Sequence, residues 1–397
     1  MPSVFPYTHA KERLLSLSYK ELSTRLCSLV SYCHATDLLN RFLRRKKAGT
    51  AVCLKTLSDS IIREGEQLQK FQECYAARVL KEYGFDPEDG LPVSLPSMEL
   101  SHPDSACISE EKVFDAIERY NQFKTGQEKA DAVRIHDKFE VSGETTYVSV
   151  DDIGVTRQKD SRIPDSVRET KYVENTVVHI AHQEGSYILT GIGMSNTLRL
   201  LAAFLLSNGL MQNKGLVFFT DGARNIRSNL ETLFPYRPYT IILDWYHLEK
   251  KCREYLSSAM KGREIRNQIS EQLLKYLWVG NVEYATDYLR HLNGSIVKSE
   301  SWLTKLIQYL DKNYSYIPCY AVRKELGLRN SSNPVEKAND MTVAQRQKHN
   351  GMSWSKSGSR ALAGIQAVYL NGEENTWFIK KKLNFQLHSM GEEKKSA

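Results

Sequence analysis

Residues 215–219 form a short apolar run that ends on a turn and then on a helix-forming segment. The chain continues as Thr220-Asp221-Gly222-Ala223-Arg224-Asn225-Ile226-Arg227. An apolar run bounded by turn residues is typical of a buried strand. The pattern therefore predicts a carboxylate, Asp221, where a buried strand gives way to a helix over 223–234. Arg224 and Arg227 follow within one turn, and such a place suits a divalent metal ion and a phosphate group.

Two further acidic positions complete a three-part pattern. The β-rich run 145–150 ends on Asp151 and Asp152, and Glu336 begins a late helix in the segment 331–339. Two strand-end aspartates and a distant glutamate are what a two-metal phosphoryl-transfer site requires, because hard cations such as Mg²⁺ take oxygen ligands. Each acid alone also has a structural explanation, as a turn or N-cap residue for Asp221 and as part of a capping box for Glu336.

The predicted elements occur in the order β-β-β-α-β-α-β. We expect strands over residues 145–156, 175–183, 186–190, 215–219 and 239–243, and helices that begin at 195 and 223. With acids at the ends of the first and fourth strands, this order predicts an α/β fold with a mixed five-stranded, ribonuclease-H-like sheet. The first and fourth strands are neighbours in that fold, so Asp151 and Asp221 would meet.

Composition divides the rest of the chain. We expect an N-terminal helical region that resembles a helix-turn-helix and binds DNA, a proline-rich linker, a catalytic domain in two segments, an aromatic helical insertion and a C-terminal tail. Their residues are, in that order, 1–83, 84–109, 110–247 with 330–370, 248–329 and 371–397.

The net charge of +7 is concentrated at the start of the chain. Residues 1–60 hold ten Lys or Arg against four Asp or Glu, a net +6. Within them, Arg44-Arg45-Lys46-Lys47 separates two segments with helical periodicity, which predicts contacts to DNA phosphates. An ordinary solvated face is the alternative.

Composition also limits where the protein works. A chain of 397 residues with 41% hydrophobic content can bury a sizeable core. Its longest apolar run, 200–206, is far shorter than the roughly 20 residues that cross a bilayer, and residues 1–8 do not resemble a signal peptide. Seven cysteines without a CxxC pair argue against a disulfide framework and a zinc ribbon. We expect a cytoplasmic protein with no membrane partner, associated with the nucleoid when bound to DNA.

Four long segments carry a family resemblance. They read VSVDDIGVTRQK, FFTDGARNIRSNLETLF, ILDWYHLEKKC and NPVEKANDMTVAQRQKHNGMSWSKSGSRALA. Together they resemble DDE transposases of bacterial insertion sequences, in the Mutator-like superfamily and closest to its ISLre-type group. The resemblance extends over roughly residues 18–370. The chain has less sequence ahead of the helix at Tyr19 than that family leads us to expect, so a truncated, inactive copy is an alternative.

The resemblance implies a centre of Asp151, Asp221 and Glu336 that binds two Mg²⁺ or Mn²⁺ ions. Asp244 and His247 match the D-x-x-H element of the superfamily. The first motif reads Asp151-Asp152 where the family has Asp-Gly or Asp-Glu, so Asp152 is the alternative first ligand.

Several other residues are candidates for DNA contact. Trp245 and Trp354 could stack on an unpaired base, and Arg346 and Lys348 lie close to Trp354 in sequence, together with Lys356 and Arg360. Core packing is the usual role of tryptophan, and a solvated face is the alternative for the charged group.

The function that follows is transposition of an insertion sequence by metal-dependent strand cleavage and strand transfer. Its partners would be the element's terminal inverted repeats and target DNA, bound by a homo-oligomer. The alternatives are a catalytically inactive, transposase-derived DNA-binding protein and a stand-alone metal-dependent nuclease.

Overall fold

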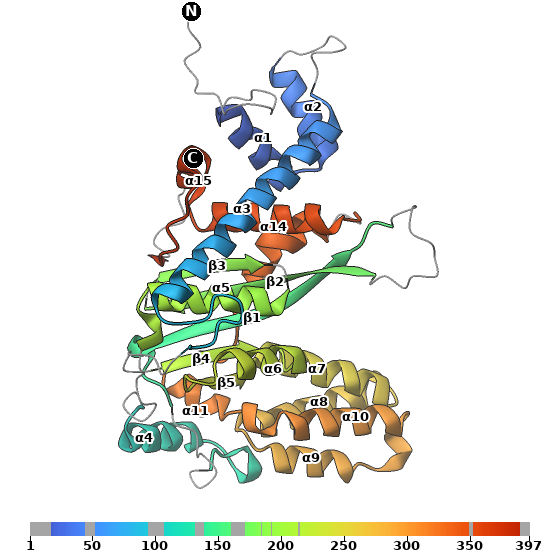
Figure 1. Cartoon of the computed structure of the whole chain (residues 1–397). Helices are drawn as coiled ribbons and strands as arrows, with labels where there is room; N and C mark the ends of the chain where they lie inside the picture. The colour runs from blue at the N-terminus through green and yellow to red at the C-terminus, as the bar shows by residue number, and fades with distance from the viewer. Residues whose placement is uncertain are drawn as a thin grey trace, which may run out of the picture. The chain divides into compact units, whose positions relative to one another are not determined.

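A computed structural model describes residues 17–43, 52–93, 107–131, 139–159, 171–183, 185–191, 193–212, 215–348 and 352–389. Six strands in this part of the chain form one sheet in the order β5-β4-β1-β2-β3-β6 (Figure 1). Their bounds are β1 Thr145–Thr156, β2 Tyr172–His182, β3 Gly185–Gly191, β4 Gly215–Thr220, β5 Thr240–Leu243 and β6 His388–Ser389.

The strand order and directions identify the fold class. β1 runs parallel to β4 and β4 parallel to β5, whereas β2 and β3 are antiparallel. Three sequential strands, extended beyond the first by two parallel strands, are the plan of a ribonuclease-H-like sheet, so the predicted fold class is confirmed. The predicted sheet lacks β6, which pairs with β3 at the sheet edge. A strand of two residues has no periodic pattern by which the sequence could reveal it.

Packing divides the chain into two compact units. The first contains the described residues within Met1–Ser97, Val150–Leu210 and Pro334–Ala397, and the second those within Met98–Ser149 and Met211–Asn333. β1 therefore contributes its first residues to the second unit and its last residues to the first. Part of the predicted linker (94–106) and the last residues of the predicted tail (390–397) lie outside the described residues.

The first unit is built around a long helix, α3, which packs along α14 and α5. Its core joins apolar side chains from α14, such as Leu362 and Ile365, to Val173 and Val177 on one face of β2. The helices are α1 Leu17–Leu29, α2 Tyr32–Phe42, α3 Leu54–Glu82, α5 Met194–Ser207, α12 Asn333–Asn339, α13 Gln345–Gln347, α14 Lys356–Leu370 and α15 Glu374–Lys380, with a π-helical turn, η7 Asp340–Ala344, after α12.

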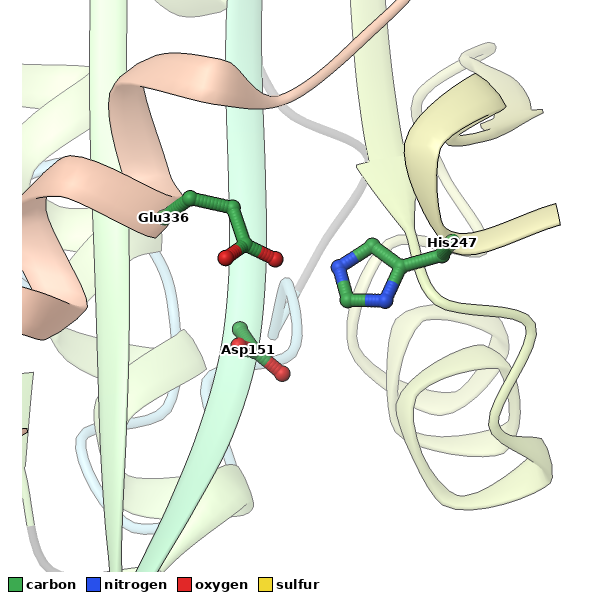
Figure 2. A group of neighbouring side chains, drawn as sticks. All are labelled: Asp151, His247 and Glu336. Atoms are coloured by element: carbon green, nitrogen blue, oxygen red, sulfur yellow. The ribbon is translucent and has the colours of Figure 1, made fainter. Parts of the chain in front are cut away.

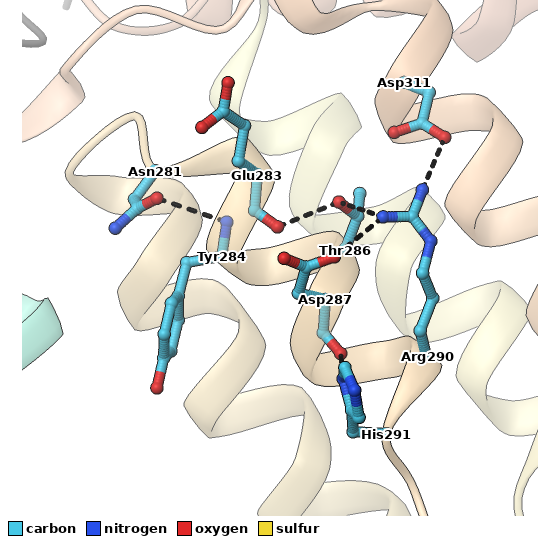
Figure 3. Close-up of polar contacts among 8 residues, drawn as sticks. All are labelled: Asn281, Glu283, Tyr284, Thr286, Asp287, Arg290, His291 and Asp311. Atoms are coloured by element: carbon cyan, nitrogen blue, oxygen red, sulfur yellow. Dashed lines mark hydrogen bonds and ion pairs between the residues drawn. The ribbon is translucent and has the colours of Figure 1, made fainter.

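The second unit combines β4, β5 and the start of β1 with a group of helices. Its core includes Leu248, Leu273, Leu306 and Leu310, one or more from each of α7, α8 and α10. The helices are α4 Glu110–Asn121, α6 Arg224–Leu233, α7 Trp245–Ala259, α8 Arg263–Trp278, α9 Val282–Arg290, α10 Glu300–Lys312 and α11 Tyr320–Glu325. On its surface Arg290 of α9 bonds Asp287 of the same helix and Asp311 of α10 (Figure 3).

The cysteines and the lengths of the apolar helices bear on two expectations from composition. All seven cysteines are free, as the absence of a paired pattern predicted. Across the described ranges, no helix is both long enough and apolar enough to cross a membrane.

Candidate metal centre

Asp151 and Asp152 face opposite sides of β1. Asp151 accepts a hydrogen bond from the side-chain amide of Asn339 on α12, and Asp152 accepts one from the Thr176 hydroxyl of β2 at 2.6 Å. Successive side chains of a strand point to opposite faces, so only one of two adjacent acids can turn toward a given helix. Asp151 is the acid on the side of α12, and Asp152 is held against the neighbouring strand.

Glu336 lies in the first turn of α12, in the same unit as Asp151. Figure 2 shows the two carboxylates turned toward each other, with oxygens within 4.8 Å. The third side chain drawn there, His247, comes from the first turn of α7 in the second unit. Two carboxylates this close repel each other in the ionised form, and a bound cation is the usual way to offset that cost.

Asn339 supplies an observation that tests the fit of a metal. Only 6% of the residue is exposed, and its Oδ1 atom has no hydrogen-bond partner in the described part of the chain. A buried carbonyl oxygen without a partner costs free energy, and amide oxygens are ligands for hard cations. The carboxylates of Asp151 and Glu336 offer oxygen ligands, which fit Mg²⁺ or Mn²⁺.

Asp221 follows β4 in the second unit, in the turn that leads to α6. Its Oδ1 atom accepts a hydrogen bond from the Ala223 amide at 2.8 Å. Gly222 between them has φ +83°, and a Cβ there would lie 2.9 Å from Leu243, so the turn requires glycine. In the sheet register Ser149 pairs with Phe219. Asp151 and Asp221 are each two residues further along these neighbouring parallel strands.

Asp244 has a structural role that its position in the D-x-x-H element does not reveal. It is completely buried and is the N-cap of α7, where it accepts a bond from the His247 amide at 3.0 Å. Its other oxygen accepts a bond from the amide of Ser332, close before α12. Both oxygens of Asp244 thus bind backbone, and the residue fixes the first turn of α7, from which His247 projects.

The residues predicted to contact DNA beside Asp221 have different surroundings. Arg224 is exposed at the start of α6. Arg227 is 7% exposed and its guanidinium lies 4.8 Å from the ring centre of Tyr316, so it packs inside the second unit. Trp245 is half-buried, with its ring edge-on to those of Trp278 and Tyr320 at 4.7 and 4.9 Å.

Arg346 and Trp354 are buried in the first unit, and this is a correction to their expected DNA contact. The Arg346 guanidinium lies 4.8 Å from the Trp354 ring centre and 5.4 Å from that of Tyr32, and its Nε donates to the Cys27 carbonyl at 2.9 Å. Trp354 donates from Nε1 to the Gln347 carbonyl. Burial lowers the pKa of Arg346, and neither side chain offers a surface to a nucleic acid.

Lys348, also predicted to contact DNA, is exposed at the end of α13. Arg44, Arg45, Lys46 and Lys47 lie outside the described residues, so their contact with DNA stays a prediction.

Sequence reasoning missed a basic hollow in the second unit, with a volume of about 910 Å³. Its cationic lining residues outnumber its acids, Glu128 and Glu271. They are Lys124, Arg253, Arg263, Arg266, Lys275 and Lys324. Tyr120, Trp245 and Trp278 complete the lining. These residues come from α4, α7, α8, α11 and the segment after α4. Because they are not consecutive in the sequence, no continuous charge run predicts the hollow.

Comparisons with known proteins add a family match. Residues 193–381 match the model of an uncharacterised protein family, UPF0236. No curated protein matches the chain in sequence. Among solved structures, the Drosophila P element transposase strand transfer complex is similar at 12% identity, over 89% of this chain and 99% of that chain, with a TM-score of 0.30. A likeness this weak adds nothing to the fold assignment, which rests on the strand order.

Proposed function

We propose that this protein is a metal-dependent DNA transposase of the DDE type, among the Mutator-like insertion-sequence transposases that its motifs resemble. One observation carries the proposal: the carboxylates of Asp151 and Glu336 turn toward each other with oxygens within 4.8 Å. The strand register supports Asp221 as the third acid, because it follows Phe219 as Asp151 follows Ser149, its partner in the sheet.

In the proposed centre, the carboxylates of Asp151, Asp221 and Glu336 would hold the metal ions. His247 is a further candidate donor. When bound, a pair of Mg²⁺ or Mn²⁺ ions would activate the attacking oxygen and stabilise the charge that develops on the phosphate.

The protein's own contribution is to hold these donors in place. Asp151 lies within a long sheet strand whose preceding residues are buried, which limits the movement of its carboxylate. Asp244 fixes the start of α7 and the chain just before α12 through two backbone amides. At the start of α6, exposed Arg224 could contact a DNA phosphate beside Asp221.

The basic hollow of the second unit supports DNA as the partner. Lys275 pairs with Glu128 and Glu271, and Arg253 pairs with Glu249. Arg263 and Lys324 have no ion pair among the described residues and are exposed. Unpaired cations around half-buried aromatic rings suit a strand of DNA, because phosphates bind the charges and bases can stack on the rings. Binding of inverted repeats by a homo-oligomer belongs to the same proposal.

Purified protein incubated with its flanking DNA tests the proposal. We expect strand cleavage with Mg²⁺ or Mn²⁺ and none in EDTA. Asp151→Asn and Glu336→Gln should each abolish cleavage without weakening DNA binding, since a metal ligand stabilises the transition state and contributes little to DNA affinity. Asp152→Asn is the matched control, because its carboxylate faces Thr176 and should be dispensable for cleavage.

The alternatives give different results in the same assay. A nuclease would cut DNA but would not join the freed 3′ ends to a target, and a DNA-binding protein would do neither. For binding, Arg263→Glu with Lys324→Glu should weaken affinity more than Lys305→Glu with Lys312→Glu, which makes the same charge change on α10. Full cleavage by Asp151→Asn would refute the assigned centre.

A further inference from the structure

A second hollow, within the first unit, has a volume of about 390 Å³. Residues of α3, α5, α14, β2 and β3 line it, among them Asn175, Arg199, Lys356 and Arg360. A smaller hollow of about 190 Å³ shares Lys356 and Arg360 and adds Arg157. The two hollows thus have the same pair of cations in their walls.

The floor of this hollow is rigid and apolar. A Cβ on Gly65 would lie 2.2 Å from the Cβ of Ala361, so α3 and α14 touch almost backbone to backbone there. Leu68, Leu200 and Ala361 line the hollow and are buried. Helices in such close contact cannot move apart without losing packing, and the hollow is therefore built into the fold.

Arg360 is a cation without a partner among the described residues. Within the described residues it makes no ion pair and no hydrogen bond, and its Nε atom is buried without an acceptor. Burial lowers the pKa of its guanidinium. The contrast is Arg346, also buried, whose Nε donates to a carbonyl. An uncompensated, partly buried cation destabilises a fold, and an anionic ligand would remove that cost.

In the same hollow, Asn175 has an acceptor atom without a donor. The residue is 1% exposed, and its amide nitrogen donates to the Ser359 hydroxyl at 2.9 Å. Its Oδ1 atom is buried and lacks a donor among the described residues. The hollow therefore offers a cation without an acceptor, an amide oxygen without a donor, and an apolar floor.

We propose that this hollow binds a phosphate-bearing ligand of nucleotide size. The phosphate would accept bonds from Arg360 and Lys356, and an N–H or O–H group of the sugar or base would donate to Asn175 Oδ1. The volume falls in the range of small-molecule sites, roughly 300–1,000 Å³. Glu66 and Glu73 also line the hollow but are exposed. The ligand is either a free nucleotide or the terminal nucleotide of a DNA strand, and the site goes beyond the proposed function.

Equilibrium binding to the full-length, metal-free protein tests this. The probes are inorganic phosphate, each of four nucleoside 5′-monophosphates, and a short oligothymidine with and without a 5′-phosphate. We expect a nucleotide or the phosphorylated oligomer to bind and to raise the unfolding temperature. Preference for the monophosphates identifies a free nucleotide, and preference for the phosphorylated oligomer a strand end. No binding by any probe would overturn the proposal.

Variants keep the test specific to the site. Arg360→Met should weaken binding about tenfold or more, because it removes a charged hydrogen bond to phosphate. Arg78→Met, at an exposed position of α3, is the matched control and should bind as the wild type does. In the absence of ligand, Arg360→Met should raise the unfolding temperature, since it removes an uncompensated cation. A lower unfolding temperature with unchanged binding would show a structural role and refute the site.

This outcome is independent of the metal centre. Probe binding is measured without metal and without cleavage, so it can succeed where cleavage fails. If Asp151→Asn abolishes cleavage but no probe binds, the proposed function stands and the nucleotide site falls.

Discussion

Asp244 in the second unit and the Asp151–Glu336 pair in the first are acids of the same sheet architecture with opposite surroundings. Both oxygens of Asp244 accept bonds from backbone amides, and the residue is fully buried. Asp151 and Glu336 are half-buried and bring their carboxylates together, with a partnerless amide oxygen on Asn339. Asp244 is held by backbone amides, whereas Asp151 and Glu336 bring two carboxylates face to face.

The surroundings of an acid separate a structural role from a candidate metal ligand. Sequence pattern gives the same signal for both, because an acid after a strand is equally suited to a cap or to a cation. What separates them is geometry, because Asp244 points at two backbone amides whereas Asp151 and Glu336 face each other.

The largest effect is expected at Asp221, which has one backbone bond and stands at the end of β4. Asp221→Asn should lower the rate of DNA cleavage by about 10³-fold or more, equivalent to roughly 4 kcal/mol of transition-state stabilisation. The unfolding free energy should stay within about 0.5 kcal/mol of wild type. Single-turnover cleavage and thermal unfolding measure the two quantities, with exposed Asp311→Asn as control. Loss of stability without loss of cleavage would mean that Asp221, like Asp244, has a structural role and is not a metal ligand.

Asp244→Ala should act mainly on stability. The change leaves two amides without acceptors, the buried one of Ser332 and the part-buried one of His247, and removes an N-cap. We expect a loss of about 2–4 kcal/mol in the free energy of unfolding. Denaturant unfolding measures it. Asp244→Asn, which keeps one acceptor oxygen, should lose less. A stable Asp244→Ala protein without cleavage activity would contradict the positioning role.

Glu64 on α3 is a third kind of acid, buried but held by cations. Burial alone would raise the pKa of Glu64, but Lys381 and Lys20 outweigh it and hold the pKa below the ordinary value of 4.5. Trp377 also donates a hydrogen bond to it at 2.7 Å. Because the folded pKa is lowered, this stabilisation is complete above about pH 4.5 and is lost as the pH falls through the folded pKa.

Glu64→Gln should therefore cost about 2 kcal/mol at neutral pH, since it leaves Lys20 without its partner in a buried position. The difference in the free energy of unfolding between the variant and the wild type should become smaller as the pH is lowered below 4.5. Chemical unfolding measured from pH 7 to pH 3 gives both quantities, and Glu66→Gln, exposed on the same helix, is the control. A gap that does not change with pH would mean that the carboxylate charge is irrelevant.

Much of the fold could be predicted from sequence because the strands carry strong local signals. The expected bounds of β1, β4 and β5 lie within a residue or so of the observed ones. The apolar runs of β4 and β5 stop just before Asp221 and Asp244, whereas β1 continues through Asp151 and Asp152 to Thr156. β6 was missed because two residues carry no pattern. The π-helical turn after α12 also has no sequence signal, although such turns often occur at functional sites.

The candidate site was less predictable, for a different reason. Residue type located Asp151 and Glu336 but could not tell that Asp152 bonds Thr176, because that depends on which face of β1 each acid occupies. Arg346 and Trp354 were misread since a charge and an aromatic ring look alike whether they stack in the core or on a base. The sequence places Arg360 among the charged candidates for DNA contact, but it does not show that the Arg360 Nε atom lacks an acceptor among the described residues, because that depends on the surrounding side chains.

The smallest change in the free energy of unfolding is expected for acids whose ion pairs are exposed to solvent. Arg290 bonds Asp287 at 2.8 Å and Asp311 at 3.1 Å, and the three side chains are 47%, 60% and 49% exposed (Figure 3). Exposed ion pairs stabilise a fold only slightly, because water screens the charges and two flexible side chains must be ordered.

Arg290→Met should therefore lower the free energy of unfolding by at most about 1 kcal/mol, and the loss should be smaller in 1 M salt, where the screening length falls to about 3 Å. Denaturant unfolding at low and high salt, with exposed Lys298→Met as control, measures this. A salt-independent loss above about 2 kcal/mol would show that Arg290 joins α9 to α10 by packing, and that its exposed acids are not merely satisfied by solvent.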